Sequence, residues 1–344
     1  MECIAIINQK GGVGKTATAV NLGAGLAQRG RRVLLIDMDP QGHLTTHLGL
    51  DGNARGSGIY EVLTRNLPLD DAIHRHSPTI AIVPAQIDLA AAEVELVSVV
   101  GRELILRDTL TAGALPYDFA LLDCPPSLGV LTLNALTAAD RVLIPMQPHF
   151  LALQGVGKLL ETVSLVSQRL NPKLRVAGIV MCMYEAATRL TGEVVADLAA
   201  FLDSSSDCSL PWQEAKIFEA RIRRNVKLAE CPSYGQSIFE YAPRSHGAAD
   251  YLALADELLG LSLSGREGRE GIRGPAREDG EETRGPVGDG NLVPKSEPQS
   301  DHKAPPQTAA MAVEPAPPKT AKAPSNGLTA RKHPLPVPLP QTDP

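Results

Sequence analysis

Apolar and polar positions along the chain alternate between two patterns. Short continuous apolar runs are followed by longer segments whose apolar residues recur at helical spacing. Continuous runs are typical of parallel strands that helices cover on both faces. The predicted strands are Ile4–Ile7, Val33–Ile36, Thr79–Val83, Asp118–Asp123, Arg141–Pro145 and Leu174–Met181. The predicted helices are Thr16–Gln28, Ile59–Leu63, Leu89–Leu110, Leu151–Leu170, Gly192–Leu202 and Gly247–Leu259.

This repeated order of strand and helix predicts an α/β fold. The expected architecture is a mostly parallel, twisted sheet with helices on both faces. Ligands of such sheets bind beyond the carboxyl ends of the strands. A ligand site is therefore expected in the segments that directly follow predicted strands.

The segment after the first predicted strand is rich in glycine and lysine. Lys10–Thr16 reads KGGVGKT and leads into a predicted helix. The Walker A pattern requires a glycine where this chain has Gln9, so the segment matches the variant Lys-Gly-Gly-x-Gly-Lys-Thr. The alternative is a glycine-rich turn that carries lysines by coincidence. The match predicts a phosphate-binding loop of the P-loop NTPase type.

Backbone and side chains of this loop are expected to hold nucleotide phosphates together. The glycines permit conformations that a Cβ forbids, so consecutive N–H groups can converge on one anion. Lys15 adds a mobile positive charge, the Thr16 hydroxyl is placed to ligate magnesium, and Ala17 cannot hydrogen-bond a phosphate. Lys10 is not needed there and could reach a phosphate bound by another subunit, as an arginine finger does. The expected contacts are Lys10, Gly11, Gly12, Val13, Gly14, Lys15, Thr16 and Ala17.

Carboxylates follow two other predicted strands. Asp37 and Asp39 come after the second strand, and Asp123 ends the fourth. Asp37 or Asp39 could position water or magnesium, and the alternative for each is an acidic turn. Asp123 has the position of a Walker B acid that holds magnesium opposite Thr16, directly or through water. The segment Cys124–Gly129 is predicted to be a switch loop.

The densest basic run before the tail is Lys216–Ala229, which reads KIFEARIRRNVKLA, and Arg244 follows later. One interpretation is a solvated basic face. The other is a patch that contacts the phosphates of nucleic acid, which needs positive charge but no sequence reading.

Composition changes near residue 261. From Leu261 to Pro344 the chain has 15 Pro, 9 Gly and no aromatic residue, which is typical of disordered sequence. Basic and acidic residues cancel there, so the net charge of −6 belongs to the preceding part. The predicted organisation is one α/β domain at 1–261 and a disordered, Pro-rich tail at 262–344. Within the tail, Pro334–Pro340 is interpreted as a spacer or a polyproline ligand.

The remaining chemistry is sparse. The five cysteines include no Cys-x-x-Cys pair, so neither a zinc site nor a disulfide framework is predicted. Four histidines in or near predicted loops, His43, His47, His74 and His76, lack a metal-ligand pattern. The start MECIAII has no signal-peptide features, and no run of 18 apolar residues occurs. A soluble, cytoplasmic protein without membrane contact is expected.

Five motifs make the region from Met1 to about Leu261 resemble the ParA/Soj-type chromosome or plasmid partition ATPases of the deviant Walker A group. They are QKGGVGKTATAVNLG at Gln9–Gly23, LLIDMDPQGH at Leu34–His43, LLDCPPSLGVLTLNAL at Leu121–Leu136, MCMYEAATRL at Met181–Leu190 and RRNVKLAECPSYGQSI at Arg223–Ile238. The resemblance implies an ATP- and Mg²⁺-dependent switch on the nucleoid. Two subunits would close over two ATP molecules, and the homodimer would bind double-stranded DNA without sequence preference. A ParB-type centromere-binding partner would stimulate hydrolysis and release.

The resemblance also implies roles for single residues. It implies catalytic roles for Lys10, Lys15 and Asp39. It implies magnesium contacts by Thr16, Asp39 and Asp123, and nucleotide contacts by Arg224 and Asn225 in addition to the loop. It implies DNA contacts by Arg224, Lys227 and Arg244.

Four positions depart from the residues usual in that family. Ala17 replaces a threonine and removes one phosphate contact, and His43 replaces an asparagine in a switch loop. Cys182 replaces a threonine and Arg223 replaces a proline, which changes the wall expected to hold the adenine. Nucleotide affinity, rather than the location of the site, is expected to differ.

Other deviant Walker A functions are weighed against this one. A nitrogenase-reductase-like role needs paired cysteines for an iron–sulfur cluster, and only Cys124 lies near the switch loop. A MinD-like septum-placement ATPase needs a basic amphipathic helix at its carboxyl end, which the ending HPLPVPLPQTDP cannot form. A nucleotide-gated ATPase that positions a non-DNA cargo, such as a polysaccharide-synthesis or flagellar complex, is the remaining alternative. The basic run distinguishes it from a DNA-binding switch.

Overall fold

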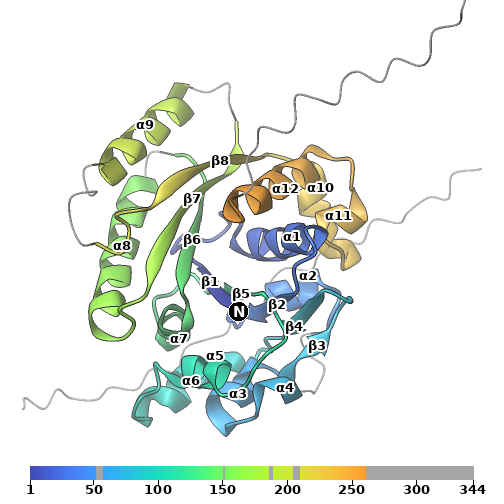
Figure 1. Ribbon diagram of the computed structural model, residues 1–344, viewed down its shortest axis with the longest axis vertical. Helices are drawn as coiled ribbons and strands as arrows, with labels where there is room; N and C mark the ends of the chain where they lie inside the picture. Colours follow the sequence, from blue (N-terminus) through green and yellow to red (C-terminus); the bar gives the residue numbers. More distant parts are fainter. Residues whose placement is uncertain (52–56, 150–151, 186–188, 204–209, 261–344) are drawn as a thin grey trace, which may run out of the picture. The chain divides into compact units, whose positions relative to one another are not determined.

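The computed structural model describes residues 1–51, 57–149, 152–185, 189–203 and 210–260, so the predicted tail at 262–344 lies outside the described residues. Within these ranges, eight strands form one sheet in the order β3-β4-β2-β5-β1-β6-β7-β8 (Figure 1). The strands are β1 (Glu2–Ile6), β2 (Val33–Asp37), β3 (His74–Arg75), β4 (Ile80–Val83), β5 (Phe119–Asp123), β6 (Arg141–Met146), β7 (Arg175–Tyr184) and β8 (Lys216–Arg223). All neighbours are parallel except β3 and β4. The predicted α/β fold is confirmed.

Helices cover both faces of this sheet (Figure 1). The helices are α1 (Lys15–Gln28), α2 (His43–His47), α3 (Ile59–Arg65), α4 (Leu69–Ala72), α5 (Leu89–Glu95), α6 (Ile105–Thr111), α7 (Val130–Ala138), α8 (Ala152–Arg169), α9 (Arg189–Asp203), α10 (Val226–Glu230), α11 (Ile238–Tyr241) and α12 (His246–Leu258). In β1, Ile4 and Ile6 face a core shared with α1 and α12, whereas Cys3 and Ala5 face a second core shared with α3, α7 and α8. Two 3₁₀ turns, η1 (Leu96–Ser98) and η2 (Cys231–Tyr234), follow α5 and α10. No helix in the described part of the chain is long and apolar enough to cross a membrane.

The single helix predicted for Leu89–Leu110 is wrong. The segment contains α5, the turn η1, a non-helical stretch and α6. Gly101 lies in that stretch with a φ of 74°, which is left-handed and incompatible with a continuing right-handed helix. Val99 and Val100 precede it, and two adjacent β-branched residues weaken helix formation further. Apolar content alone was therefore a poor guide to helix length here.

The basic run contains a strand that the sequence analysis did not predict. In β8, Phe218, Ala220 and Ile222 are buried at every second position, while charged residues occupy most of the positions between them. This is the pattern of an edge strand with one covered face. The sequence analysis missed this strand, because the alternation is only eight residues long and half of its residues are basic or acidic.

Candidate nucleotide site

Two glycines with left-handed backbone shape the loop between β1 and α1. Gly12 has a φ of 74° and Gly14 a φ of 95°, values that residues with a Cβ rarely adopt. α1 begins at Lys15, and its first turn has neither a side-chain cap nor an acidic residue. Its free N–H groups and the positive end of the helix dipole therefore point to an anion site.

The Lys15 side chain is buried beside this loop. Its Nζ donates a hydrogen bond to the backbone oxygen of Lys10 at 3.2 Å. Burial lowers the pKa of Lys15, and the nearby carboxylates of Asp123 and Asp39 oppose that change. A buried ammonium held only by a neutral carbonyl gains from a bound anion, whose charge would stabilise the protonated form.

Asp123 and Asp37 lie side by side at the carboxyl ends of β5 and β2. The strand register pairs Asp123 with Asp37 on one side and with Ile6 on the other. Both carboxylate oxygens of Asp123 are buried, and neither has a hydrogen-bond partner among the described residues. Burial and the neighbouring Asp37 raise the pKa of Asp123 well above its usual value, while the adjacent Thr16 side chain opposes the rise. An unsatisfied carboxylate beside a threonine hydroxyl fits the hard oxygen ligands that Mg²⁺ takes.

Protein side chains alone do not form a metal cage here. Among the residues that the structure describes, no group of three or more His, Cys, Asp and Glu side chains could hold a metal ion. Mg²⁺ is commonly held by one or two side chains together with phosphates and waters, rather than by an all-protein cage. The site thus fits a cation that arrives with a phosphate.

The two acids after β2 have different surroundings. Asp37 accepts hydrogen bonds from the backbone and hydroxyl of Thr45 at 2.9 and 2.7 Å, and from the backbone of Asp39 at 3.2 Å. Burial raises the pKa of Asp37 to about 6, and the Thr45 hydrogen bonds oppose the rise. Asp39 is buried and accepts a hydrogen bond from the backbone of Gln41 at 3.0 Å. Asp37 therefore shapes the loop, whereas Asp39 stands at its turn, with His43 exposed further on at the start of α2.

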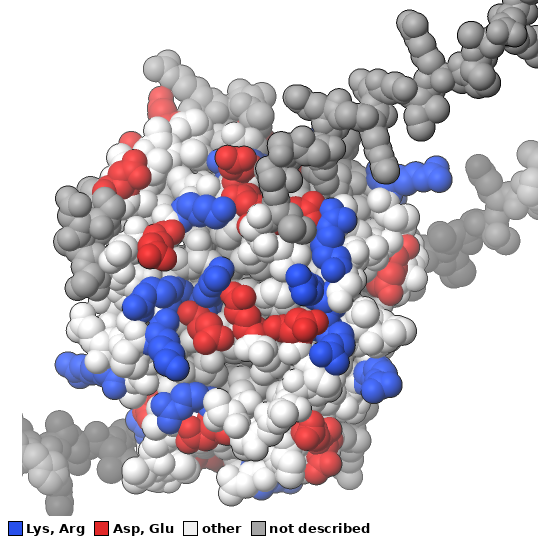
Figure 2. Space-filling model, in the orientation of Figure 1, with Lys and Arg blue, Asp and Glu red and all other residues white. Residues whose placement is uncertain are grey.

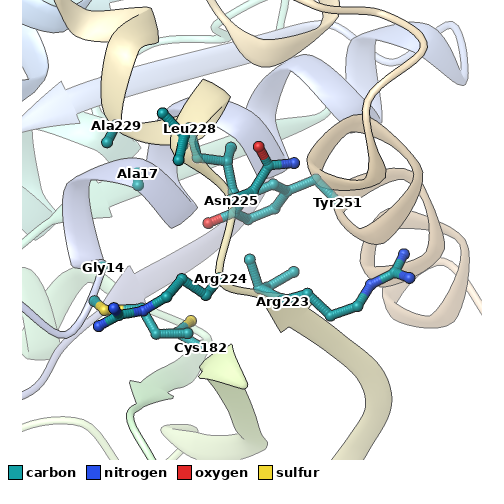
Figure 3. Close-up of a pocket in the computed structure, with 12 residues that line it drawn as sticks. Gly14, Ala17, Cys182, Arg223, Arg224, Asn225, Leu228, Ala229 and Tyr251 are labelled. Carbon is teal, nitrogen blue, oxygen red and sulfur yellow. The ribbon is translucent and has the colours of Figure 1, made fainter. Parts of the chain in front are cut away.

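A cavity of about 420 Å³ opens beside Gly14 and the start of α1. It is largely apolar and its size suits a nucleotide base and sugar. Figure 3 shows the Tyr251 ring among the lining side chains, and Arg224 extending toward Gly14 and Cys182. The lining residues are Gly14, Ala17, Cys182, Met183, Ile222, Arg223, Arg224, Asn225, Val226, Leu228, Ala229 and Tyr251.

Three departures from the family pattern, Ala17, Cys182 and Arg223, line this cavity. The Cys182 thiol is buried next to the Thr18 hydroxyl at 3.8 Å, and Thr18 shares a 3.3 Å hydrogen bond with the hydroxyl of Tyr251. Burial raises the pKa of Cys182 to about 12, so its thiol is neutral at pH 7. Arg223 lines the cavity but points its guanidinium away from Gly14, where it pairs with Asp250 (Figure 3). Cys182 and Arg223 therefore line the cavity without placing a charged group in its interior.

The Lys10 side chain does not point into the phosphate loop. Its side chain is exposed, and its Nζ contacts Nε2 of His149. Both residues line a second cavity of about 230 Å³, and burial and the Lys10 charge lower the pKa of His149. Neutral imidazole can accept a hydrogen bond from the ammonium, so His149 holds Lys10 at the surface of the subunit. The sequence analysis did not single out His149.

Most residues of the basic run have acidic neighbours, and two of them, Arg223 and Arg224, line the cavity. Arg224 Nε lies 3.2 Å from Glu185 Oε1, and Lys227 Nζ lies 2.8 Å from Glu230 Oε2. Arg223 and Lys216 pair with Asp250 and Glu257. Arg244 is exposed in the turn before α12. On the face in Figure 2, Lys and Arg side chains are interspersed with Asp and Glu.

The α/β sheet, the glycine loop and the buried acid at its edge define a nucleotide-binding protein of the P-loop class. The chain matches the sequence profile of the AAA domain over residues 1–176. It is 45% identical over 260 residues to the chromosome partitioning protein ParA of Myxococcus xanthus, covering 74% of this chain and 87% of that protein. It is 44% identical over 258 residues to the sporulation initiation inhibitor protein Soj of Bacillus subtilis, covering 75% and 98%. The chain therefore belongs to the ParA/Soj family of chromosome-partitioning ATPases, as the motifs predicted.

A solved structure supports the same assignment of fold. The crystal structure of a Mycobacterium smegmatis protein described as cobyrinic acid a,c-diamide synthase, with bound ADP and magnesium, has a TM-score of 0.63 and 38% identity to this chain. The match covers 75% of this chain and 94% of that protein.

Proposed function

We propose that this chain is an ATP- and Mg²⁺-dependent switch for DNA partition. The observation that carries the proposal is the buried Asp123 carboxylate, which no described protein group satisfies, at the uncapped start of α1. Relatives named for chromosome partitioning support the process, and the relative that holds ADP and magnesium supports the ligands.

ATP would place its phosphates on the loop from Lys10 to Ala17 and its base in the cavity beside Arg224 and Asn225. Thr16, Asp39 and Asp123 are the proposed magnesium contacts. When bound, magnesium would neutralise phosphate charge during hydrolysis. Lys15 would contact the phosphates from its buried position.

Asp39 is proposed to orient the water that attacks the terminal phosphate, since it lies at the turn after β2 and beside the phosphate loop. Lys10 is proposed to reach the nucleotide of a second subunit, because its exposed side chain is directed away from its own loop's interior. Breaking the contact with His149 would free the Lys10 ammonium to reach the nucleotide of the second subunit. Nucleotide binding and dimer formation would then depend on each other.

DNA would be bound without sequence preference by Arg224, Lys227 and Arg244 of the closed homodimer. We propose that residues 1–261 form the ATPase domain. A ParB-type partner would stimulate hydrolysis, and the protein would act in the cytoplasm on the nucleoid. The acidic partners of Arg224 and Lys227 would have to give way to phosphates. Arg244, which is exposed, needs no such exchange in the described surroundings.

One observation favours a second candidate function. Four basic side chains of the run, Lys216, Arg223, Arg224 and Lys227, already have acidic partners. A surface with this balance suits a nucleotide-gated ATPase that positions a cargo other than DNA. Relatives named for chromosome partitioning favour DNA over that alternative.

A salt titration separates the two functions. Fluorescence anisotropy with a labelled DNA duplex and a non-hydrolysable ATP analogue should show binding that weakens steeply with salt, because neutralised phosphates release counterions. Removing the charge of Lys227 or Arg244 should weaken binding and lower the salt slope by about one unit per lost contact, while ATP-dependent dimers persist. Glu230→Gln is the opposite control: it removes the acidic partner of Lys227 and should strengthen DNA binding. A wild-type dimer that ignores DNA at low salt would exclude the DNA switch and favour the other cargo.

A further inference from the structure

Lys10 combines a fixed backbone with a movable side chain. Its N–H donates a hydrogen bond to the side chain of Asn8 at 3.0 Å, and its carbonyl accepts one from the buried Lys15 ammonium at 3.2 Å. The side chain of Lys10 is exposed and contacts Nε2 of His149. No acidic residue pairs with it in the described part of the chain. Among those residues, His149 is therefore the side-chain partner of this ammonium.

A buried asparagine holds the two contacting segments together. Nδ2 of Asn8 donates a hydrogen bond to the backbone oxygen of Pro145 on β6 at 2.8 Å, while its Oδ1 accepts the one from Lys10. His149 follows Pro145 by four residues. One carboxamide thus ties the phosphate loop to the strand that leads to His149. The contact between Lys10 and His149 therefore joins segments that the protein interior already positions.

The surroundings of this contact contain no group that would offset a second positive charge. Lys10 and His149 line a cavity of about 230 Å³, and its other lining residues come from the phosphate loop, β6, the segment after β6 and α8. These other residues are uncharged and do not titrate: Asn8, Gln9, Val13, Met146, Gln147 and Gly155. Within the described lining of this cavity, Lys10 is therefore the charged group that His149 faces.

The protonation state of His149 consequently controls the contact. A neutral imidazole can accept a hydrogen bond from the Lys10 ammonium, whereas a protonated imidazole has no acceptor and repels it. Partial burial and the Lys10 charge both lower the pKa of His149 from its ordinary value of 6.5, so the imidazole is neutral at pH 7. Since the contact favours the neutral form, it is present above pH 6.5 and is lost progressively as the pH falls below this value.

We propose that His149 is a pH-sensitive latch that holds Lys10 within its own subunit and releases it for the second subunit when the imidazole is protonated. The inference rests on the proposed intersubunit role of Lys10, whereas the contact itself does not. Release favours the closed dimer, because a larger fraction of subunits then has a free ammonium. One such hydrogen bond changes this fraction about 3-fold, and both subunits must release Lys10. The dimer dissociation constant should therefore change by up to about 10-fold.

The contact is tested first in the full chain without nucleotide. An NMR titration of the His149 ring, assigned through the loss of its signal in His149→Gln, reports its pKa in the wild type and in Lys10→Ala. His149 should titrate at lower pH in the wild type, because Lys10→Ala removes one of the two causes that lower its pKa. Equal titration of His149 in the two proteins would overturn the proposal.

The second test is the dimer dissociation constant at pH 7.5 and 5.5, measured by sedimentation velocity with a non-hydrolysable ATP analogue. At pH 7.5, His149→Ala should dimerise up to about 10-fold more tightly than the wild type, and this difference should shrink at pH 5.5. His149→Gln keeps an oxygen acceptor that does not titrate, so its weaker dimer should persist at both pH values relative to His149→Ala. Comparison of variants at the same pH cancels the titration of all other groups.

Two further variants make the result specific. His74→Gln replaces an exposed histidine on the edge strand β3 and should keep the wild-type pH response. If Lys10→Ala stays monomeric while wild type and His149→Ala dimerise equally at pH 7.5, the latch is overturned and the intersubunit role of Lys10 stands. If Lys10→Ala forms ATP-dependent dimers, the proposed role of Lys10 is overturned together with the latch.

Discussion

The guanidinium of Arg223 and the carboxylate of Asp250 form a two-point ion pair that ties the end of β8 to α12. Nη2 of Arg223 lies 2.5 Å from Oδ1, and the backbone N–H of Arg223 donates to Oδ2 at 3.0 Å. The next residue, Tyr251, lines the base cavity and shares a hydrogen bond with Thr18 of α1. The ion pair therefore links the cavity wall to the helix that carries the phosphate loop.

Asp250→Asn is expected to weaken ATP binding by about 3- to 10-fold, the effect of losing a hydrogen bond to a charged group. Stability should fall only by about 1 kcal/mol, because the Arg223 side chain is half-exposed and water can solvate it. Titration with a fluorescent ATP analogue and urea unfolding measure the two effects.

Asp256→Asn is the matched control for that change. Asp256 lies on the same helix and makes the same kind of two-point pair with Arg29, at 2.5 and 2.7 Å. Unlike Arg223, however, Arg29 does not line the cavity. It should cost similar stability and leave ATP affinity unchanged. Equal weakening of ATP binding by both variants would show that Asp250 acts through general stability alone.

A buried histidine predicts how stability depends on pH. His47 is 2% exposed, and burial lowers its pKa to about 4, against the opposing effect of a hydrogen bond with the Gln236 backbone. Between pH 6.5 and 4 the unfolded chain therefore binds the proton and the folded chain does not, so stability falls as pH falls through this window. The His47 contribution should drop by about 2 kcal/mol between pH 7 and 4.5.

Urea unfolding of the wild type and His47→Gln across this range isolates the effect, since glutamine does not titrate. The difference between the two proteins is the quantity to compare, because Asp37 acts in the opposite direction. Its pKa is raised to about 6, so the folded chain gains stability from Asp37 as pH falls below that value. His43→Gln, at the exposed start of the same helix, is the control for replacing a histidine of this helix. Parallel pH profiles of wild type and His47→Gln would contradict the prediction.

The sequence predicted best those parts of the candidate site that lie within one short segment of the chain. The loop and the acids after β2 and β5 were predictable, because continuous apolar runs mark parallel strands and ligands bind at their carboxyl ends. Tyr251 and Asp250 were not, since their contacts with Thr18 and Arg223 join segments far apart in the chain. No spacing pattern in one sequence reports such pairs.

Other features were missed because two signals competed. The β8 alternation was hidden by its charges, and the helix predicted for Leu89–Leu110 ignored the break at Gly101. The same apolar content that suggested a long buried helix there belongs in part to exposed side chains, such as Val94, Val97 and Val100. Apolar periodicity shows which residues share a helix face, but it does not show whether the chain itself covers that face.

Substitutions of Lys15 and Asp39 should affect different steps, ATP binding and ATP hydrolysis respectively. Lys15→Ala removes the buried charge beside the phosphate loop and should weaken ATP binding by about 100-fold or more. Asp39→Ala should bind ATP but hydrolyse it about 100-fold more slowly, because the water loses its orienting group. Equilibrium binding and phosphate release measure the two steps separately. Equal loss of ATP binding in both variants would show that Asp39 serves mainly in binding.

Lys10 provides the test of the closed dimer. Its exposed side chain contacts His149 within the subunit, and the proposed active position is the nucleotide of the second subunit. Dimer formation should therefore require both ATP and this ammonium, and Lys10→Ala should stay monomeric in sedimentation velocity at nucleotide concentrations that give wild-type dimers. Lys158→Ala removes an exposed lysine from α8 and should still form dimers. ATP-dependent dimers of Lys10→Ala would rule out the intersubunit role, because the loop's other lysine, Lys15, is buried in its own subunit and cannot supply a mobile ammonium to the second one.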